Sequence, residues 1–158
     1  MIVIAPYAQQ LRNGLENPKN YPLGYWDEVL RLLGDREPII QVGVDGENQL
    51  VPDFRKNLST SQLYELLDAC RTWVSVDSYF QHLAWDYGKF GHVIFSQSDP
   101  LIFGHPENNN LLRSRTFLRA NQFLMWEQAQ YQLAAYVAPG EVYAALRSAE
   151  LHTLSDVP

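Results

Sequence analysis

Short apolar runs along the chain are separated by polar turns and by segments with helical periodicity. Ile2–Ala5 and Pro38–Val44 are almost continuously apolar, which is typical of strands buried on both faces of a parallel sheet. β-Branched and aromatic residues predict two further strands, at Trp73–Val76 and His92–Phe95.

Apolar residues between these runs recur three and four positions apart, as on the buried face of an amphipathic helix. Four helices are predicted from such stripes: Trp26, Val29, Leu30 and Leu33; Leu63, Leu66, Leu67 and Cys70; Phe80, Leu83, Ala84 and Tyr87; Val142, Ala145, Leu146 and Ala149. Gly34 is placed to end the first helix, and Ser59 with Gln62 has the spacing of a capping box for the second. Pro139 suits the first turn of the last one.

Two later segments are harder to assign. Leu112–Leu118 alternates arginine with apolar residues like an edge strand, although a helix that begins near Thr116 also fits. Trp126–Val137 is predicted to be helical.

Strands that alternate with helices predict an α/β fold, with a Rossmann-like parallel sheet between two layers of helices. At 158 residues the chain is long enough for one such domain, expected to span residues 1–151 with a frayed tail at 152–158. In such sheets ligands bind beyond the carboxyl ends of the strands.

Composition and charge narrow the function classes. The net charge of −6 argues against a general nucleic-acid binder, which normally has a basic face. Arg113, Arg115 and Arg119 either oppose an anionic ligand or form a solvated face. The single cysteine, Cys70, excludes an internal disulfide and lies on a helical stripe, so we expect it to be buried.

The sequence also lacks the marks of a membrane or metal protein. It contains no apolar stretch of the roughly twenty residues that span a bilayer and no basic signal-peptide start, so we expect no membrane span and a cytoplasmic location. No metal-binding spacing or phosphate-binding glycine loop of the Walker type is present, and neither a metal nor a cofactor is predicted.

Polar residues follow the predicted strands, where parallel strands would bring them to one edge. Lys19 lies in the long loop after the first strand, Glu47 follows the second, and Asp77 and Ser78 follow Trp73–Val76. His82 falls about 150° from the centre of its helix's apolar stripe and is therefore not a core residue of that helix. Three of these residues also fit a position without function: Lys19 as a solvated lysine, Glu47 as an exposed turn residue, and His82 as a surface histidine or one packed under a loop.

The segment Ser75-x-Asp77-Ser78-x-x-x-His82-Leu83-Ala84 resembles a signature of the ADP-heptose:lipopolysaccharide heptosyltransferases, which are glycosyltransferases of the GT-B fold. Three further segments are similar to motifs of that family and occur in its order: Pro18–Pro22 followed by Tyr25-Trp26, Gln41–Gly43 followed by Glu47, and Val93–Phe95 followed by Asp99-Pro100. The resemblance covers most of the chain and implies the C-terminal, donor-binding half of such an enzyme.

The resemblance also implies roles for the polar residues. The backbone after Asp77, the Ser78 hydroxyl and the Lys19 ammonium would hold the diphosphate of a nucleotide-sugar donor, and Glu47 would hold its ribose. Asp77 would either cap the helix or order the sugar hydroxyls, and His82 would add one hydrogen bond. Tyr79 and Ser96 stand where the family has glycine, which changes the shape expected for the diphosphate pocket.

Three functions remain open from the sequence. The chain is a glycosyltransferase-like donor-binding domain that acts only with a partner acceptor domain, supplied by another chain or by self-association. Alternatively, it is a non-catalytic module that binds a nucleotide or nucleotide-sugar, or a structural protein that reuses the fold.

Overall fold

The computed structural model describes the backbone of residues 1–155 and the side chains of residues 1–148. Within these residues the strands and α-helices follow one another in this order: β1 (Ile2–Ala5), α1 (Leu23–Leu33), β2 (Ile39–Gly43), β3 (Asp53–Lys56), α2 (Thr60–Ala69), β4 (Thr72–Val76), α3 (Tyr79–Asp86), β5 (His92–Ile94), α4 (Pro100–Phe103), β6 (Asn109–Leu111) and α5 (Pro139–Ser155).

The six strands form one parallel sheet in the order β3-β2-β1-β4-β5-β6. The chain builds outward from β1 to β3 and then returns to the other side of β1 as β4. The strand order therefore reverses between β1 and β4, and the loops that leave these two strands diverge there, which opens a crevice at their carboxyl ends. The predicted α/β, Rossmann-like parallel sheet is confirmed.

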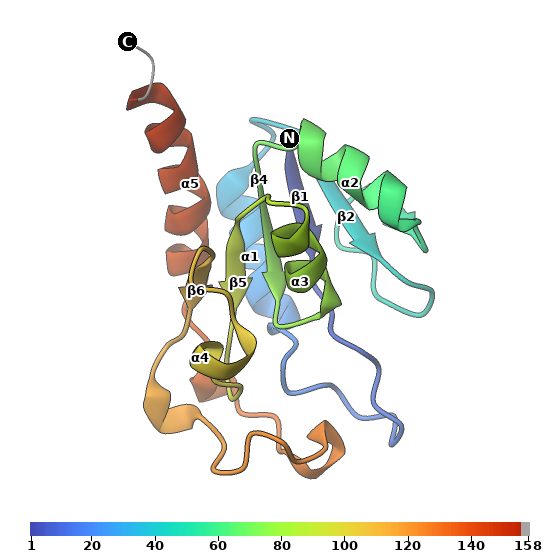
Figure 1. The fold of residues 1–158 in the computed structure, drawn as a ribbon, viewed down its shortest axis with the longest axis vertical. Coiled ribbons are helices and arrows are strands. Elements are labelled where there is room, and N and C mark those ends of the chain that lie inside the picture. The colour runs from blue at the N-terminus through green and yellow to red at the C-terminus, as the bar shows by residue number, and fades with distance from the viewer. Residues whose placement is uncertain (156–158) are drawn as a thin grey trace.

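Helices cover both faces of the sheet, as predicted (Figure 1). Alternate residues of β1 point to opposite faces: Ile2 and Ile4 pack in a core with residues of α1 and α5, whereas Val3 and Ala5 pack in a core with residues of α2 and α3. Each β1 side chain is buried, with no more than 6% of its surface exposed. β1 is therefore the central strand of both cores.

The predicted helix ends are also confirmed. Ser59 and Gln62 form the reciprocal capping box at the start of α2. Gly34 follows α1 with φ of 59°, a left-handed conformation that glycine adopts without strain. Cys70 is buried, 3% exposed.

Two predictions about the segment between β6 and α5 were wrong. Residues 112–118 form no strand: β6 ends at Leu111 because its partner β5 has only three residues, and a 3₁₀ turn at Arg115–Phe117 follows. Residues 126–137 form two separate 3₁₀ turns rather than a helix. In place of helical partners, two backbone carbonyls of this segment accept hydrogen bonds from Gln97 and Arg113 side chains.

We call residues 112–138 the strap. It runs beneath the lower end of the sheet in Figure 1, the same end as the loop that follows β1. Tertiary contacts hold it there: the Tyr131 hydroxyl donates to the Asn20 carbonyl at 3.0 Å, and the Tyr136 hydroxyl donates to the carbonyl of Pro18. Local periodicity could not predict a segment whose conformation depends on distant partners.

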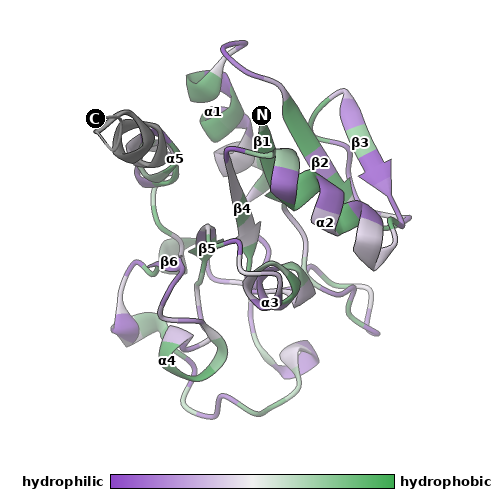
Figure 2. Cartoon of the chain, turned by 45° about the horizontal axis from the view of Figure 1, so that its top comes forward, coloured by the Kyte–Doolittle hydropathy of each residue, from purple (hydrophilic) through white to green (hydrophobic). Residues whose placement is uncertain are grey.

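The sequence pattern also missed β3 and α4. β3 is an edge strand of sequence Asp-Phe-Arg-Lys with three exposed residues, so it lacks apolar alternation, and it is the most hydrophilic strand in Figure 2. α4 is a single turn opened by Asp99, whose side chain accepts a hydrogen bond from the Leu101 amide.

The C-terminal helix α5 extends to Ser155, four residues past the domain end predicted at 151; residues 156–158 of the predicted tail lie outside the described residues. Within the described part of the chain, no helix combines the length and apolar composition that a bilayer crossing requires.

Candidate functional site

Asp77 lies buried at the carboxyl end of β4, where the chain turns into α3. Only 3% of its surface is exposed. Gln81 Nε2 donates to Oδ1 at 2.6 Å, and Ser98 Oγ donates to Oδ2 at 2.7 Å. The Lys19 ammonium lies 3.4 Å from the same Oδ2. Asp77 is thus the centre of a polar network that connects β4, α3 and two loops.

Ser78 occupies the N-cap position of α3 in an extended conformation, and its side chain makes no capping hydrogen bond. The first amides of α3 therefore lack a side-chain cap at the end of the helix where the macrodipole is positive. This arrangement suits an anionic ligand.

Lys19 belongs to a loop that is fixed by hydrogen bonds on both sides of it. The Ser96 hydroxyl donates to the Pro18 carbonyl at 2.9 Å, and Asn20 Oδ1 accepts from the Ala8 amide at 2.7 Å. The Lys19 ammonium lies 5.1 Å from the centre of the Trp126 ring, within cation–π range. The strap and the Asp77 network together define the position of this charge.

Glu47 folds back over the end of β2. Its Oε2 accepts a hydrogen bond from the Val44 amide at 3.2 Å, and it lies so close to Gly43 that a Cβ at that position would overlap it. Partial burial raises the pKa of the Glu47 carboxyl, and the bond from Val44 offsets part of the effect. The glycine at 43 therefore makes room for the carboxylate.

His82 is exposed on α3, away from the apolar stripe, as the helical pattern predicted. Its Nδ1 lies 2.8 Å from Nε2 of His105. Burial and the neighbouring His105 lower the pKa of His82; Lys19 also lowers it, whereas Asp77 raises it. The imidazole is therefore neutral at neutral pH.

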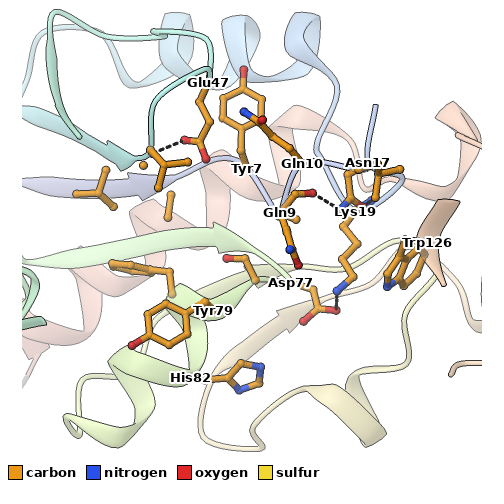
Figure 3. Close-up of a pocket in the computed structure, with 18 of the residues that line it drawn as sticks. Tyr7, Gln9, Gln10, Asn17, Lys19, Glu47, Asp77, Tyr79, His82 and Trp126 are labelled. Atoms are coloured by element: carbon orange, nitrogen blue, oxygen red, sulfur yellow. Dashed lines mark hydrogen bonds and ion pairs between the residues drawn. The ribbon is translucent and has the colours of Figure 1, made fainter. Parts of the chain in front are cut away.

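A cavity of about 1050 Å³ opens among these residues at the carboxyl end of the sheet (Figure 3). All five predicted site residues line it: Lys19, Glu47, Asp77, Ser78 and His82. These residues lie together at one edge of the sheet, as their positions after the strands predicted. The cavity is large enough for a nucleotide-sugar. Tyr79, the residue that departs from the motif, is 69% exposed and also lines the cavity.

The sequence pattern missed several residues of this cavity. Met125, Trp126 and Glu127 reach it from the strap, which no local signal placed there. Gln81 has no exposed surface, although it is not one of the residues named for the apolar stripe of α3. Its spacing of four residues from Asp77 is the one signal that could have indicated the bond between them.

Cationic and anionic groups do not balance in the cavity. Six charged side chains line it: Arg12, Lys19, Asp45, Glu47, Asp77 and Glu127. Carboxylates outnumber cations, and Lys19 is already paired with Asp77. Among the described residues, no group of three or more His, Cys, Asp or Glu side chains is placed to hold a metal ion.

No protein-family model matches this chain, and no curated protein matches it by sequence. Solved structures do match its fold, and two of them are heptosyltransferases. The chain superimposes on Escherichia coli heptosyltransferase WaaC with ADP at a TM-score of 0.64 and 15% identity, covering 94% of this chain and 43% of that one.

The second is the dodecameric iron-containing heptosyltransferase TibC in complex with ADP-D-β-D-heptose, at a TM-score of 0.67 and 12% identity, covering 96% of this chain and 45% of that one. The chain thus has a GT-B heptosyltransferase-like fold and spans less than half the length of either enzyme. At these identities the likeness shows the fold alone.

Proposed function

We propose that this chain is the donor-binding domain of a heptosyltransferase-like glycosyltransferase of the GT-B fold, and that it corresponds to the C-terminal domain of such enzymes. The observation that supports this best is that Lys19, Glu47, Asp77, Ser78 and His82 line one cavity beside the start of α3. The ligand is a nucleoside diphosphate sugar, the kind of molecule that TibC holds.

In this proposal the diphosphate lies against the uncapped amides of α3 and the Ser78 hydroxyl. Lys19 neutralises part of its charge, and Asp77 holds Lys19 in place from the buried side. As the glycosidic bond breaks, negative charge grows on the departing diphosphate, and donors that are already in position stabilise it without reorganisation. Glu47 accepts hydrogen bonds from the ribose hydroxyls.

Transfer of the sugar requires an acceptor site and a base, which we assign to a partner domain. The surface beside the cavity supports this assignment. Leu101 of α4 is 82% exposed and Phe123 of the strap 78%, and the Phe123 ring lies 5.9 Å from that of Phe103, which lines the cavity. Exposed apolar groups at a cavity mouth are typical of a surface that another protein covers.

One observation favours a different class, a structural protein that reuses the fold. The excess of carboxylates over cations in the cavity opposes a free diphosphate. The two functions differ in a simple binding measurement, since a structural protein would bind no nucleoside diphosphate.

Gly43→Ala tests the proposed ribose contact. The new methyl group overlaps Oε2 of Glu47, so the carboxylate must move; the third of its three nearest atoms belongs to the partly exposed Phe54 ring, 3.2 Å from the Cβ position. Loss of a hydrogen bond to a charged group costs about 1.5–3 kcal/mol, so the affinity for the nucleoside diphosphate should fall about tenfold or more with little change in melting temperature.

Gly24→Ala is the matched control, because nothing lies within 4 Å of its Cβ position. Unchanged affinity in Gly43→Ala would remove Glu47 from the binding site.

A further inference from the structure

His105 has no role in the site described so far, although it is hydrogen-bonded to one of its members. It lies in the loop after α4, and its Nε2 is 2.8 Å from Nδ1 of His82. We propose that His105 is a positioning residue that fixes His82 as the tautomer with hydrogen on Nε2, so that this N–H donates to a phosphate oxygen of the ligand. The ligand in this inference is that of the proposed function.

The His105 ring is held by its neighbours. It stacks on Trp85 of α3, with ring centroids 4.3 Å apart and planes inclined by 8°. Trp85 is fixed in turn, since its Nε1 donates to Glu107 Oε2 at 3.0 Å. The imidazole is therefore oriented by a stack as well as by its bond to His82.

The backbone beneath His105 is equally constrained. A Cβ on Gly104 would lie 2.6 Å from the Pro100 carbonyl oxygen, so the loop packs against α4 more closely than any other residue at 104 would permit. Asn110 Nδ2 donates to the His105 carbonyl at 3.0 Å. These contacts fix the backbone at His105.

The hydrogen bond between the two rings determines which nitrogen of His82 bears the proton. A neutral imidazole has one donor and one acceptor nitrogen, and the partner of one nitrogen decides the state of the other. If His105 donates from Nε2, Nδ1 of His82 accepts and its Nε2 carries hydrogen. If His82 donated to His105 instead, Nε2 of His82 would present a lone pair to the ligand, and this lone pair would repel an anionic phosphate oxygen.

Burial is the largest cause of the lowered pKa of His82, so this ring is neutral near pH 7. Lys19 and Asp77 face His82 from the cavity side, and Glu107 is engaged by Trp85 on the other side. Two imidazoles at this distance cannot both be protonated without strong repulsion. His82 therefore acts as an oriented neutral donor.

Nitrogen-15 NMR of the histidine side chains reads the tautomer directly. In the full chain at pH 7.5, the His82 signals, assigned by their loss in His82→Gln, should be those of a ring with hydrogen on Nε2. His105→Phe keeps an aromatic ring over Trp85 but cannot donate, and it should give a mixture of tautomers. His105→Gln keeps an N–H donor and should restore the parent pattern.

Calorimetric titration with ADP gives the functional readout. His105→Phe should weaken ADP binding about three- to tenfold, and His105→Gln should bind within about twofold of the parent, with both variants melting cooperatively. Hydrogen on Nδ1 of His82 in the parent, or a parent-like pattern in His105→Phe, would overturn the inference. If the parent binds none of ADP, UDP, GDP and CDP, the proposed function fails, while the NMR spectrum still decides the tautomer.

Discussion

Replacing Asp77 by asparagine tests whether the buried polar network holds this end of the sheet together. Both carboxylate oxygens of Asp77 accept hydrogen bonds, from Gln81 and from Ser98, and Oδ2 also faces the Lys19 ammonium. An asparagine must turn its NH₂ group toward one of these donors, and the partly exposed Lys19 ammonium loses its counter-ion.

The loss of stability expected for Asp77→Asn depends on the burial of the ion pair rather than on its length. The side chain of Asp77 is 4% exposed and that of Lys19 21%. Breaking a buried ion pair by removing one partner costs about 3–5 kcal/mol, and the partial exposure of Lys19 places Asp77→Asn near the lower end, about 3 kcal/mol.

The exposed pair of Asp53 and Arg55 on β3 is the matched control. Its nitrogen–oxygen distance is shorter, 2.9 Å against 3.4 Å, but its side chains are 47% and 43% exposed. Exposed pairs contribute about 0–1 kcal/mol, so Asp53→Asn should change stability by no more than that.

Urea denaturation at pH 7 measures the free energy of unfolding of both variants. A loss in Asp77→Asn that does not exceed the loss in Asp53→Asn would refute the view that Asp77 is the centre of a buried network. Lys19→Met should cost less than Asp77→Asn, because Asp77 keeps both of its hydrogen bonds.

Two further predictions concern the core and the pH dependence of stability. Gly91→Ala should destabilise the protein by about 1–3 kcal/mol in the same denaturation assay, since its Cβ would overlap the fully buried Trp73 ring, while Gly24→Ala, with nothing near its Cβ, should cost nothing. Burial lowers the pKa of His92 to about 4, so below pH 6.5 the unfolded chain binds a proton that the folded chain does not. The free energy of unfolding therefore decreases as the pH is lowered. Between pH 8 and pH 5 this decrease is about 2 kcal/mol. His92→Gln should lose about 2 kcal/mol less stability than the parent over the same range, and equal losses in the two proteins would show that His92 is not the group responsible.

The sequence predicted the parts of the fold that depend on local pattern. Continuous apolar runs predicted four of the six strands in the described residues, and a capping box and a terminal glycine predicted helix ends. β3 was not predicted, because an exposed edge strand needs no apolar alternation. The conformation of the strap was not predicted, because side chains distant in sequence, such as Gln97, donate hydrogen bonds to its carbonyls.

The candidate site divides in the same way. Lys19, Glu47 and Asp77 were found because each follows a strand and matches a motif position, and a parallel sheet brings such residues to one edge. Trp126 and His105 were not found, because each reaches its partner only through the folding of a loop. Residues that act through tertiary contact leave no periodic signal.

Binding of a nucleoside diphosphate to the purified chain is the decisive test of the proposed donor site. Calorimetric titrations with ADP, UDP, GDP and CDP, each beside its monophosphate, would be repeated on Lys19→Met. We expect one diphosphate to bind saturably and more tightly than its monophosphate. Lys19→Met should weaken that binding about tenfold or more, the effect of losing one hydrogen bond to a charged group. If none of the four diphosphates binds, the cavity is no donor site.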